Sequence, residues 1–335
     1  MSDDRLLALS AWVAQTLNES RCRLELASGD ASFRRYFRVH AAGGASYIAM
    51  DAPPAKEDCR PYVRVARAFR AVGLNVPEII AEDLAQGFLL VSDLGDRLYL
   101  DALNDRTVER LYGDAMQALQ RLQRDANTAG LPPYDASLLH REMELFREWY
   151  LGRHLGIPLA AREHAVLDRA FECLAAAALE QPRVAVHRDY HSRNLMVTAA
   201  NNPGILDFQD AVVGPVTYDL VSLLRDCYVA WPRERVESWA HEYRGRANRA
   251  GVPVGEDASR FLRWFDLMGV QRHLKAIGIF ARLNLRDGKP NYLRDIPRAL
   301  AYVIDVAARY PQLGELGELA AGLPTATDGA AGKPV

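Results

Sequence analysis

The sequence predicts an α+β fold of two lobes, with a small β-rich N-terminal lobe followed by a large, mainly helical lobe. Two periodicities lead to this prediction. Residues 24–50 alternate between apolar and polar side chains and carry glycine turn signals, as antiparallel strands do. From residue 98 onward, apolar residues recur at helical spacing almost throughout. The polar, glycine-containing run at 92–96 breaks both patterns, so we place the lobe boundary after residue 95.

The N-lobe, residues 1–95, opens with a predicted helix and continues as a sheet. Glycines at Gly29 and at Gly43-Gly44 mark turns between short alternating runs. A later helix should end at Gly73, because glycine commonly follows the last helical residue. In chain order we expect a helix over 6–17, strands over 24–26, 33–39 and 46–50, a helix over 57–72, and strands over 78–81 and 88–91.

The C-lobe, residues 96–322, should be built from long helices. Its only clear strands are the β-branched run 184–186 and two apolar runs, 195–198 and 204–206, which flank a turn and predict a hairpin. The tail 323–335 is rich in Ala, Gly, Thr and Pro and is expected to be disordered. Helices are expected over 98–127, 137–153, 160–180, 217–229, 233–250, 257–286 and 292–309.

The overall composition is that of a soluble globular protein. Of 335 residues, 49% are apolar and 25% are charged, and the net charge of −2 gives no basic footprint for nucleic acid or an anionic membrane. No apolar run approaches the ~20 residues that a membrane span requires. Scattered cysteines and the absence of a signal peptide favour the reducing cytoplasm. We expect a cytoplasmic monomer that binds neither nucleic acid nor membrane.

One motif carries most of the chemistry. The run His187-Arg188-Asp189 is followed by Asn194 and, thirteen residues further, by Asp207. In the kinase pattern H-R-D-x-x-x-x-N, the Asp accepts the hydroxyl proton and the Asn binds magnesium, while a later Asp bridges metal and phosphates. The sequence therefore predicts phosphoryl transfer from Mg-ATP, with Asp189, Asn194 and Asp207 as catalytic residues, the last two being the metal ligands.

The local context supports this interpretation. The predicted hairpin would place Asn194 and Asp207 at the ends of adjacent strands. A chance match, in which Asp and Asn merely cap turns, would not require that arrangement.

At these residues the chain resembles the aminoglycoside phosphotransferase and choline kinase family of the protein-kinase-like fold. The resemblance covers about residues 20–320. Asp207-Phe-Gln-Asp210 stands in place of D-F-G, the segment 214–220 reads Gly-Pro-Val-Thr-Tyr-Asp-Leu, and no long activation segment follows. The resemblance implies a bilobal, protein-kinase-like fold in which His187 and Asp219 brace the catalytic loop.

Within that family, three segments resemble the bacterial kinases that phosphorylate the anomeric hydroxyl of N-acetylmuramate and N-acetylglucosamine. The segments are 29–39, 50–54 and 271–283. The resemblance implies a sugar 1-phosphate product made during peptidoglycan recycling in the cell wall. Only this resemblance, and no pattern of composition or spacing, points to an amino sugar.

Nucleotide binding should depart from the protein-kinase pattern. Met50 stands where kinases usually have a phosphate-contacting lysine, and backbone N–H groups of residues 29–32 can form an anion-binding turn. Arg34, Arg35 or Lys56 can supply the missing charge, but side chains alternate on a strand, so Arg34 and Arg35 cannot both face the cleft. The nucleotide-binding candidates are Gly29, Ala31, Ser32, Phe33, Arg35, Met50, Asp93 and Leu94. For Asp93 the alternative is that its side chain only forms a turn.

The acceptor site should surround Asp189. Asp210 is a candidate for a sugar hydroxyl or a second metal, and the lactyl carboxylate of N-acetylmuramate requires a cationic partner. The substrate-binding candidates are Asp189, Asp210, Arg225, Arg272 and Lys275. The alternative for the basic residues is that they extend from a half-buried helix into solvent.

Two other functions remain open from the sequence. One is a kinase of another small alcohol, such as an aminoglycoside, choline or homoserine, although cationic acceptors favour an acidic pocket and the 271–275 run is basic. The other is a nucleotide-binding pseudokinase, which Met50 favours and the intact trio of Asp189, Asn194 and Asp207 opposes.

Overall fold

The computed structural model describes residues 4–19, 22–29 and 33–324. Ala31, Ser32 and residues 325–335 of the expected tail lie outside the described residues. The chain forms two compact units, one of residues 1–127 with 193–211 and one of residues 128–192 with 212–335. These units are defined by internal contacts, and the lobe boundary at residue 95 stays a prediction from the sequence.

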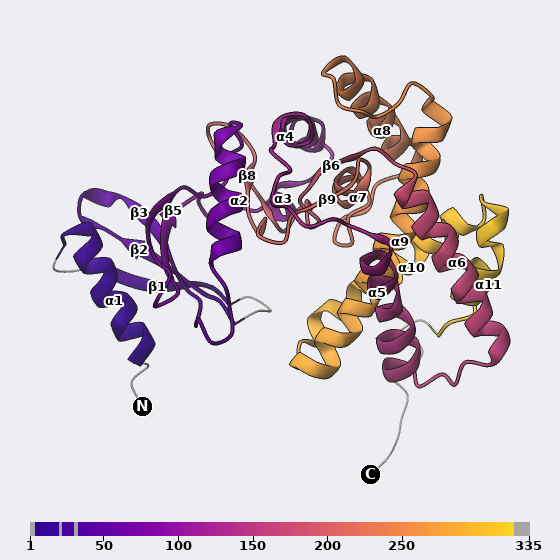
Figure 1. The fold of residues 1–335 in the computed structure, drawn as a ribbon, viewed down its shortest axis with the longest axis horizontal. Helices are drawn as coiled ribbons and strands as arrows, with labels where there is room; N and C mark the ends of the chain where they lie inside the picture. The colour runs from indigo at the N-terminus through magenta and orange to yellow at the C-terminus, as the bar shows by residue number, and fades with distance from the viewer. Residues whose placement is uncertain (1–3, 20–21, 30–32, 325–335) are drawn as a thin grey trace, which may run out of the picture. The chain divides into compact units, whose positions relative to one another are not determined.

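The first unit is built on a five-stranded antiparallel sheet, which confirms the predicted β-rich start (Figure 1). β5 pairs with β3 on one side and β4 on the other, and four of its five residues are buried because both of its faces are covered. The strand order is β1 (Arg23–Gly29), β2 (Arg35–His40), β3 (Ser46–Asp51), β5 (Phe88–Ser92) and β4 (Ile79–Asp83).

Helix α1 (Asp4–Leu17) covers one face of this sheet, and α2 (Arg60–Ala71) lies on the other side (Figure 1). Leu9 and Val13 of α1 pack with Phe37, Val39 and Ala49, which are alternate residues of β2 and β3. Residues of the opposite parity on these strands therefore face away from α1.

The chain returns to the first unit as the predicted hairpin, β7 (Leu195–Met196) and β8 (Gly204–Ile205). Gly204 forms a β-bridge with Asn75, and the ring of Phe208 packs 4.8 Å from that of Tyr62 on α2. The hairpin thus packs against α2 and the segment that follows it. Helices α3 (Tyr99–Ala102) and α4 (Val108–Asp125) complete this unit.

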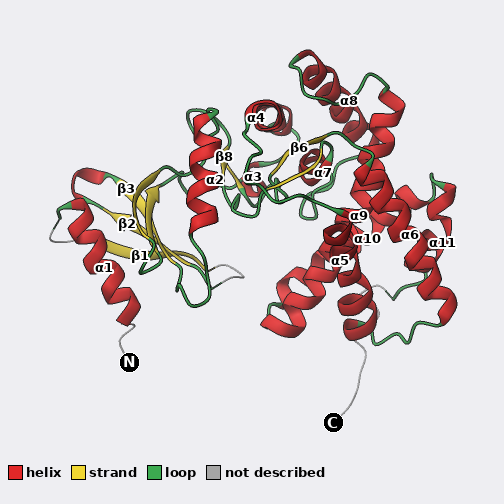
Figure 2. Cartoon of the chain, in the orientation of Figure 1, coloured by secondary structure: helices red, strands yellow, loops and turns green. Residues whose placement is uncertain are grey.

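The second unit is mainly helical, as Figure 2 shows, and is organised around α9 (Ala258–Asp287). This 30-residue helix is buried on nearly all sides because it contacts most other helices of the unit. They are α5 (Ala136–Leu145), a π-helix over Phe146–His154, α6 (Ala161–Leu179), α7 (Tyr218–Leu224), α8 (Arg233–Arg249) and α10 (Ile296–Ala307).

At Gly278, helix α9 lies against the backbone where α5 ends. A Cβ there would come within 2.3 Å of the backbone carbon of Leu145, where α5 gives way to the π-helix. Only glycine permits this approach. The predicted helix over 137–153 is confirmed, and from Phe146 onward its turns are π-helical rather than α-helical.

Other predicted elements also differ from the structure in their bounds or were missed. The predicted helix over 98–127 is broken into α3 and α4, because Asn104 and Thr107 accept hydrogen bonds from the backbone N–H groups of Arg106 and Asn104. The helix predicted over 217–229 ends at Leu224. The sequence also missed β9 (Val212–Pro215), a short strand that pairs with β6 (Arg183–Val186), and α11 (Gly314–Ala321).

Two global expectations can be compared with the structure. The thiols of Cys22, Cys59, Cys173 and Cys227 are all free and are buried or half-buried. Within the described ranges, no helix has both the length and the apolar character to cross a bilayer.

Candidate active site

In the second unit, the loop that carries Asp189 is held by Asp219. β6 ends at Val186, and the buried Asp219 of α7 accepts hydrogen bonds from the next two backbone N–H groups, those of His187 (2.6 Å) and Arg188 (2.9 Å). Arg188 has φ +78°, in the left-handed region that non-glycine residues rarely adopt. The two hydrogen bonds fix the backbone in this conformation and so set the direction of the loop.

His187 lies inside the loop. Its side chain is fully buried, its Nδ1 accepts a 3.3 Å hydrogen bond from the backbone N–H of Asp189, and its ring meets that of Tyr190 edge-on at 5.7 Å. These contacts orient the backbone of Asp189.

Asp189 is half-buried among cationic side chains. Burial alone would raise the pKa of its carboxyl, but the nearby charges of Lys275, His191 and Arg272 hold this pKa well below its usual range. Asp189 is therefore ionised at neutral pH and can accept a hydrogen bond from a hydroxyl group.

Glu142, a buried carboxylate beside this loop, belongs to no sequence motif and was not predicted. Glu142 of α5 forms ion pairs with Arg188 and, at 3.4 Å, with Lys275, whose Nζ also donates to the Tyr218 hydroxyl at 3.1 Å. These charges keep the pKa of Glu142 low despite its burial. One sequence signal could have indicated its burial, because Glu142 lies three residues after Leu139 and so shares an apolar helical face with it.

The two predicted arginines of the acceptor site have different surroundings. Arg272 of α9 is buried, contributes to the field at Asp189, and donates to the sulfur of Cys227 at 3.7 Å. Arg225 is instead engaged in a buried ion pair with Asp266, which also accepts a hydrogen bond from Arg233 at 3.1 Å. Arg272 and Lys275 thus contribute positive charge at Asp189, while Arg225 is paired with Asp266 and its role in substrate binding stays a prediction.

In the first unit, the hairpin brings Asn194 and Asp207 together. The Leu206 N–H donates to the Asn194 carbonyl at 2.8 Å, and the Asn194 Nδ2 lies 3.4 Å from the Asp207 Oδ2. Gln209 Nε2 donates to the other Asp207 oxygen at 2.6 Å. Asp207 has φ +60°, a conformation that Asp tolerates better than most residues.

These side chains have the donor chemistry that magnesium prefers. Mg²⁺ is usually bound by one or two carboxylates, with water and substrate phosphates completing six oxygen ligands. Asp207 offers a carboxylate, and rotation of the Asn194 amide by 180° exchanges its nitrogen for its oxygen. Across the described part of the chain, no group of three or more His, Cys, Asp or Glu forms a denser metal cluster.

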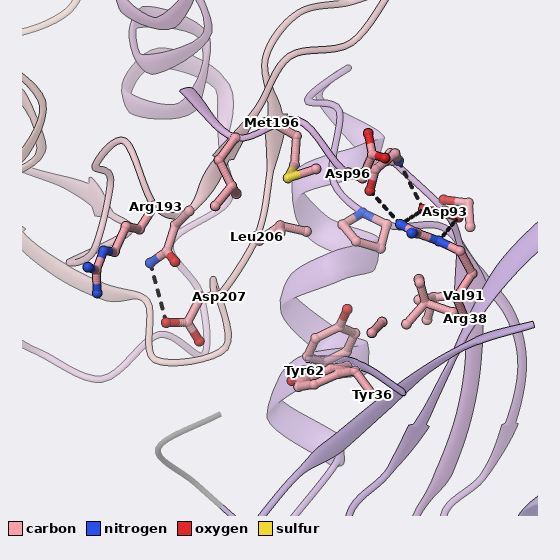
Figure 3. A pocket seen from close by; sticks show the side chains of 18 residues that line it. Tyr36, Arg38, Tyr62, Val91, Asp93, Asp96, Arg193, Met196, Leu206 and Asp207 are labelled. Atoms are coloured by element: carbon pink, nitrogen blue, oxygen red, sulfur yellow. Dashed lines mark hydrogen bonds and ion pairs between the residues drawn. The ribbon is translucent and has the colours of Figure 1, made fainter. Parts of the chain in front are cut away.

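A pocket in the first unit lies beside this pair (Figure 3). Figure 3 shows Asp207 and the Arg38–Asp93 ion pair on opposite sides of it. The wall between them is mostly apolar and aromatic, which suits a planar base. Its lining includes Tyr36, Arg38, Ile48, Tyr62, Val91, Asp93, Leu94, Asn194, Met196, Leu206 and Asp207.

The predicted nucleotide residues are distributed unevenly around this pocket. Asp93 and Leu94 line it, but the Asp93 carboxylate accepts from Arg38 Nε at 2.7 Å and from the Gly95 N–H at 2.9 Å, so its side chain forms a turn. Gly29 ends β1 and pairs with Arg35 in the sheet register. Phe33 is largely exposed, and its backbone N–H donates to Glu57 at 3.2 Å.

Arg35 points to the α1 side of the sheet. Its guanidinium pairs at 2.5 Å with the buried Asp51, its partner across β2 and β3, and Arg5 of α1 pairs with the same carboxylate. The geometry thus gives no support to the predicted nucleotide contact of Arg35. Asp210 follows β8 in the first unit and is exposed.

A model of the phosphotransferase enzyme family matches residues 23–262. The chain is also similar to the N-acetylmuramate/N-acetylglucosamine kinase of Pseudomonas putida, with 50% identity over 331 residues that cover 96% of this chain and 97% of the relative.

Solved structures show the same fold at low sequence identity. A choline kinase from Streptococcus pneumoniae has a TM-score of 0.66 at 12% identity, covering 92% of this chain and all of the kinase chain. An ADP-bound aminoglycoside phosphotransferase has a TM-score of 0.59 at 14% identity, covering 88% of this chain and 97% of its own. These likenesses confirm the predicted kinase-like fold.

Proposed function

The chain belongs to the phosphotransferase enzyme family, and on this premise we propose that it transfers the γ-phosphoryl group of ATP to the anomeric hydroxyl of N-acetylmuramate and N-acetylglucosamine. The choice of sugar rests on the relative from Pseudomonas putida, which carries that name and matches nearly the whole chain. The single observation that supports phosphoryl transfer is the position of Asp189 on a loop that Asp219 fixes through the backbone N–H groups of His187 and Arg188.

In this proposal Asp189 orients the C1 hydroxyl and takes up its proton as the new O–P bond forms, while the bond from the γ-phosphorus to the bridging oxygen breaks and ADP leaves. Because its carboxyl has a low pKa, Asp189 acts mainly by accepting the hydroxyl hydrogen bond and receives the proton late. Asp219 and His187 hold the loop, so the carboxylate does not need to reorganise during the reaction.

Asn194 and Asp207 would hold Mg²⁺, with the nucleotide base in the adjoining pocket of the first unit. Bound there, the metal would neutralise negative charge on the β- and γ-phosphates. Gln209, which donates to Asp207 at 2.6 Å, would orient the carboxylate toward the metal.

The surroundings of Asp189 suit an amino sugar with an acidic substituent. Arg272 and Lys275 contribute positive charge there, which matches the lactyl carboxylate of N-acetylmuramate. An aromatic series begins at His191, whose ring is 5.4 Å from that of Tyr228, and continues through Phe280 to Tyr292. Aromatic faces suit the apolar side of a pyranose ring. The same positive field disfavours choline and aminoglycosides, which are cations.

The proposed product is the sugar 1-phosphate, and we place the reaction in peptidoglycan recycling, in the cytoplasm, with the chain acting as a monomer. The test is a coupled assay of ATP consumption with and without N-acetylmuramate, together with ³¹P NMR of the product. We expect sugar-dependent turnover and a phosphate on C1. Asp189→Asn should bind Mg-ATP normally and lose turnover. The proposal would be wrong if ATP consumption did not depend on the sugar, or if only other alcohols were phosphorylated.

A further inference from the structure

The pocket face of the sheet lacks the lysine of the kinase pattern. In the register of β2 and β3, Tyr36 pairs with Met50 and Arg38 pairs with Ile48, so these four side chains share one face. Tyr36, Arg38 and Ile48 line the pocket. Met50 therefore lies on the face where the strand lysine of a kinase would reach the phosphates, but a thioether carries no charge to offer them.

Arg34 is positioned to supply that charge. Successive side chains of an extended segment point to opposite faces of the sheet. Arg34 lies two residues before Tyr36 and therefore shares its pocket side, while the neighbouring Arg35 faces α1. The Arg34 side chain is only 13% exposed and donates a hydrogen bond to the pocket-lining Tyr36. Its charge is also felt at Asp207, the proposed metal ligand.

Glu57 holds Arg34 in place. The Arg34 guanidinium lies 3.2 Å from Glu57 Oε2, while the other oxygen of Glu57 accepts the backbone N–H of Phe33 at 3.2 Å. Glu57 is 14% exposed and stands just before α2. One carboxylate thus fixes both the backbone and the side chain at the start of β2, as an acidic residue fixes the phosphate-binding lysine in kinases.

We propose that Arg34, oriented by Glu57, is the cation that binds the phosphates of Mg-ATP in place of the missing strand lysine. This inference rests on the proposed function, because it assigns a residue to its nucleotide site. A guanidinium presents a planar fork of N–H donors that matches phosphate oxygens, and it stays charged at any pH the protein experiences. Three of its N–H donors are enough to keep the hydrogen bonds to Glu57 and Tyr36 and to make one to a phosphate oxygen.

The test measures binding rather than turnover, so it does not depend on the acceptor. Mg-ATP and adenosine are titrated separately into wild type, Arg34→Ala and Arg34→Gln, and thermal unfolding checks that each variant is folded. Arg67→Ala is the matched control, because Arg67 also pairs with a glutamate of the first unit, Glu82 at 2.9 Å, and is absent from the pocket lining. A double variant, Arg34→Ala with Met50→Lys, returns a lysine to the strand.

We expect both Arg34 variants to lose about tenfold or more in Mg-ATP affinity and to keep their affinity for adenosine, which has no phosphates. Met50→Lys should restore part of the loss, and Arg67→Ala should match wild type. Mg-ATP affinity within about twofold of wild type in Arg34→Ala, or an equal loss for adenosine, would overturn the inference. Failure of wild type to bind Mg-ATP would overturn the proposed function itself.

Discussion

Asp219 accepts the backbone N–H of His187 at 2.6 Å, yet burial raises the pKa of the Asp219 carboxyl to about 7. The hydrogen bonds from the loop favour the ionised form, while burial and the nearby charge of Asp189 favour the protonated form. The group that orients the catalytic loop therefore titrates close to neutrality.

This titration should be visible in stability. Between about pH 4 and pH 7 the folded chain keeps a proton at Asp219 that the unfolded chain has lost. The contribution of Asp219 to the free energy of unfolding is therefore complete below about pH 4 and is lost as the pH rises to 7. Asp219→Asn removes it. In urea denaturation across this range, the stability of wild type relative to the variant should fall by roughly 1.4 kcal/mol per pH unit. A difference that is independent of pH would contradict the raised pKa.

Lys275 should set the acid limit of catalysis. Its charge is the largest of those that lower the pKa of Asp189 against the effect of burial, so wild-type kcat should not fall through protonation of Asp189 between pH 8 and pH 5. Lys275→Met should move the acid limb of the kcat profile to higher pH, while Lys275→Arg, which keeps the charge, should retain the wild-type limb. If the kcat profiles of Lys275→Met and Lys275→Arg against pH superimposed, Lys275 would not have this role.

Arg272 should discriminate between the two sugars. N-acetylmuramate carries a lactyl carboxylate that N-acetylglucosamine lacks, so Arg272→Met should lower kcat/KM about tenfold or more further for the first sugar than for the second. An effect of Arg272 on Asp189 would lower kcat/KM equally for both sugars, so it cancels when the two losses are compared. Arg272→Lys serves as the charge-retaining variant. Equal losses for the two sugars would show that Arg272 acts only on Asp189 or on the fold.

Two helical glycines provide a matched test of packing. Gly278→Ala places a methyl group 2.3 Å from the backbone of Leu145, which cannot move like a side chain, and should destabilise the protein by about 1–3 kcal/mol. Gly245 of α8 has its nearest neighbour at 3.6 Å, the flexible end of Arg249, so Gly245→Ala should be neutral or stabilise by up to about 1 kcal/mol. Chemical denaturation measures both, and equal effects would contradict this account.

The elements that sequence predicted best are those with local signals. The alternation at 24–50 predicted the sheet, and the apolar runs 195–198 and 204–206 around a turn predicted the hairpin. β9 was missed because four residues are too short for a periodicity, and its pairing with β6 is formed by segments 26 or more residues apart.

The site residues that sequence left undecided depend on contacts between distant segments. Alternation alone showed that Arg34 and Arg35 face opposite ways, but only the register with Asp51 assigns the α1 side to Arg35. Arg225 and Arg272 both looked suitable for an acidic substrate, and only the ion pair with Asp266 separates them. Buried charges are paired, but sequence does not name the partner.

The hairpin that carries Asn194 and Asp207 also constrains the order of folding. It belongs to the first unit, although 65 residues of the second unit, 128–192, are synthesised before it. A ribosome that has released only residues 1–127 has made the sheet but neither proposed metal ligand. Nucleotide binding of the kind proposed must therefore wait until residue 211 has emerged, and a truncated N-terminal fragment should not serve as a separate ATP-binding module.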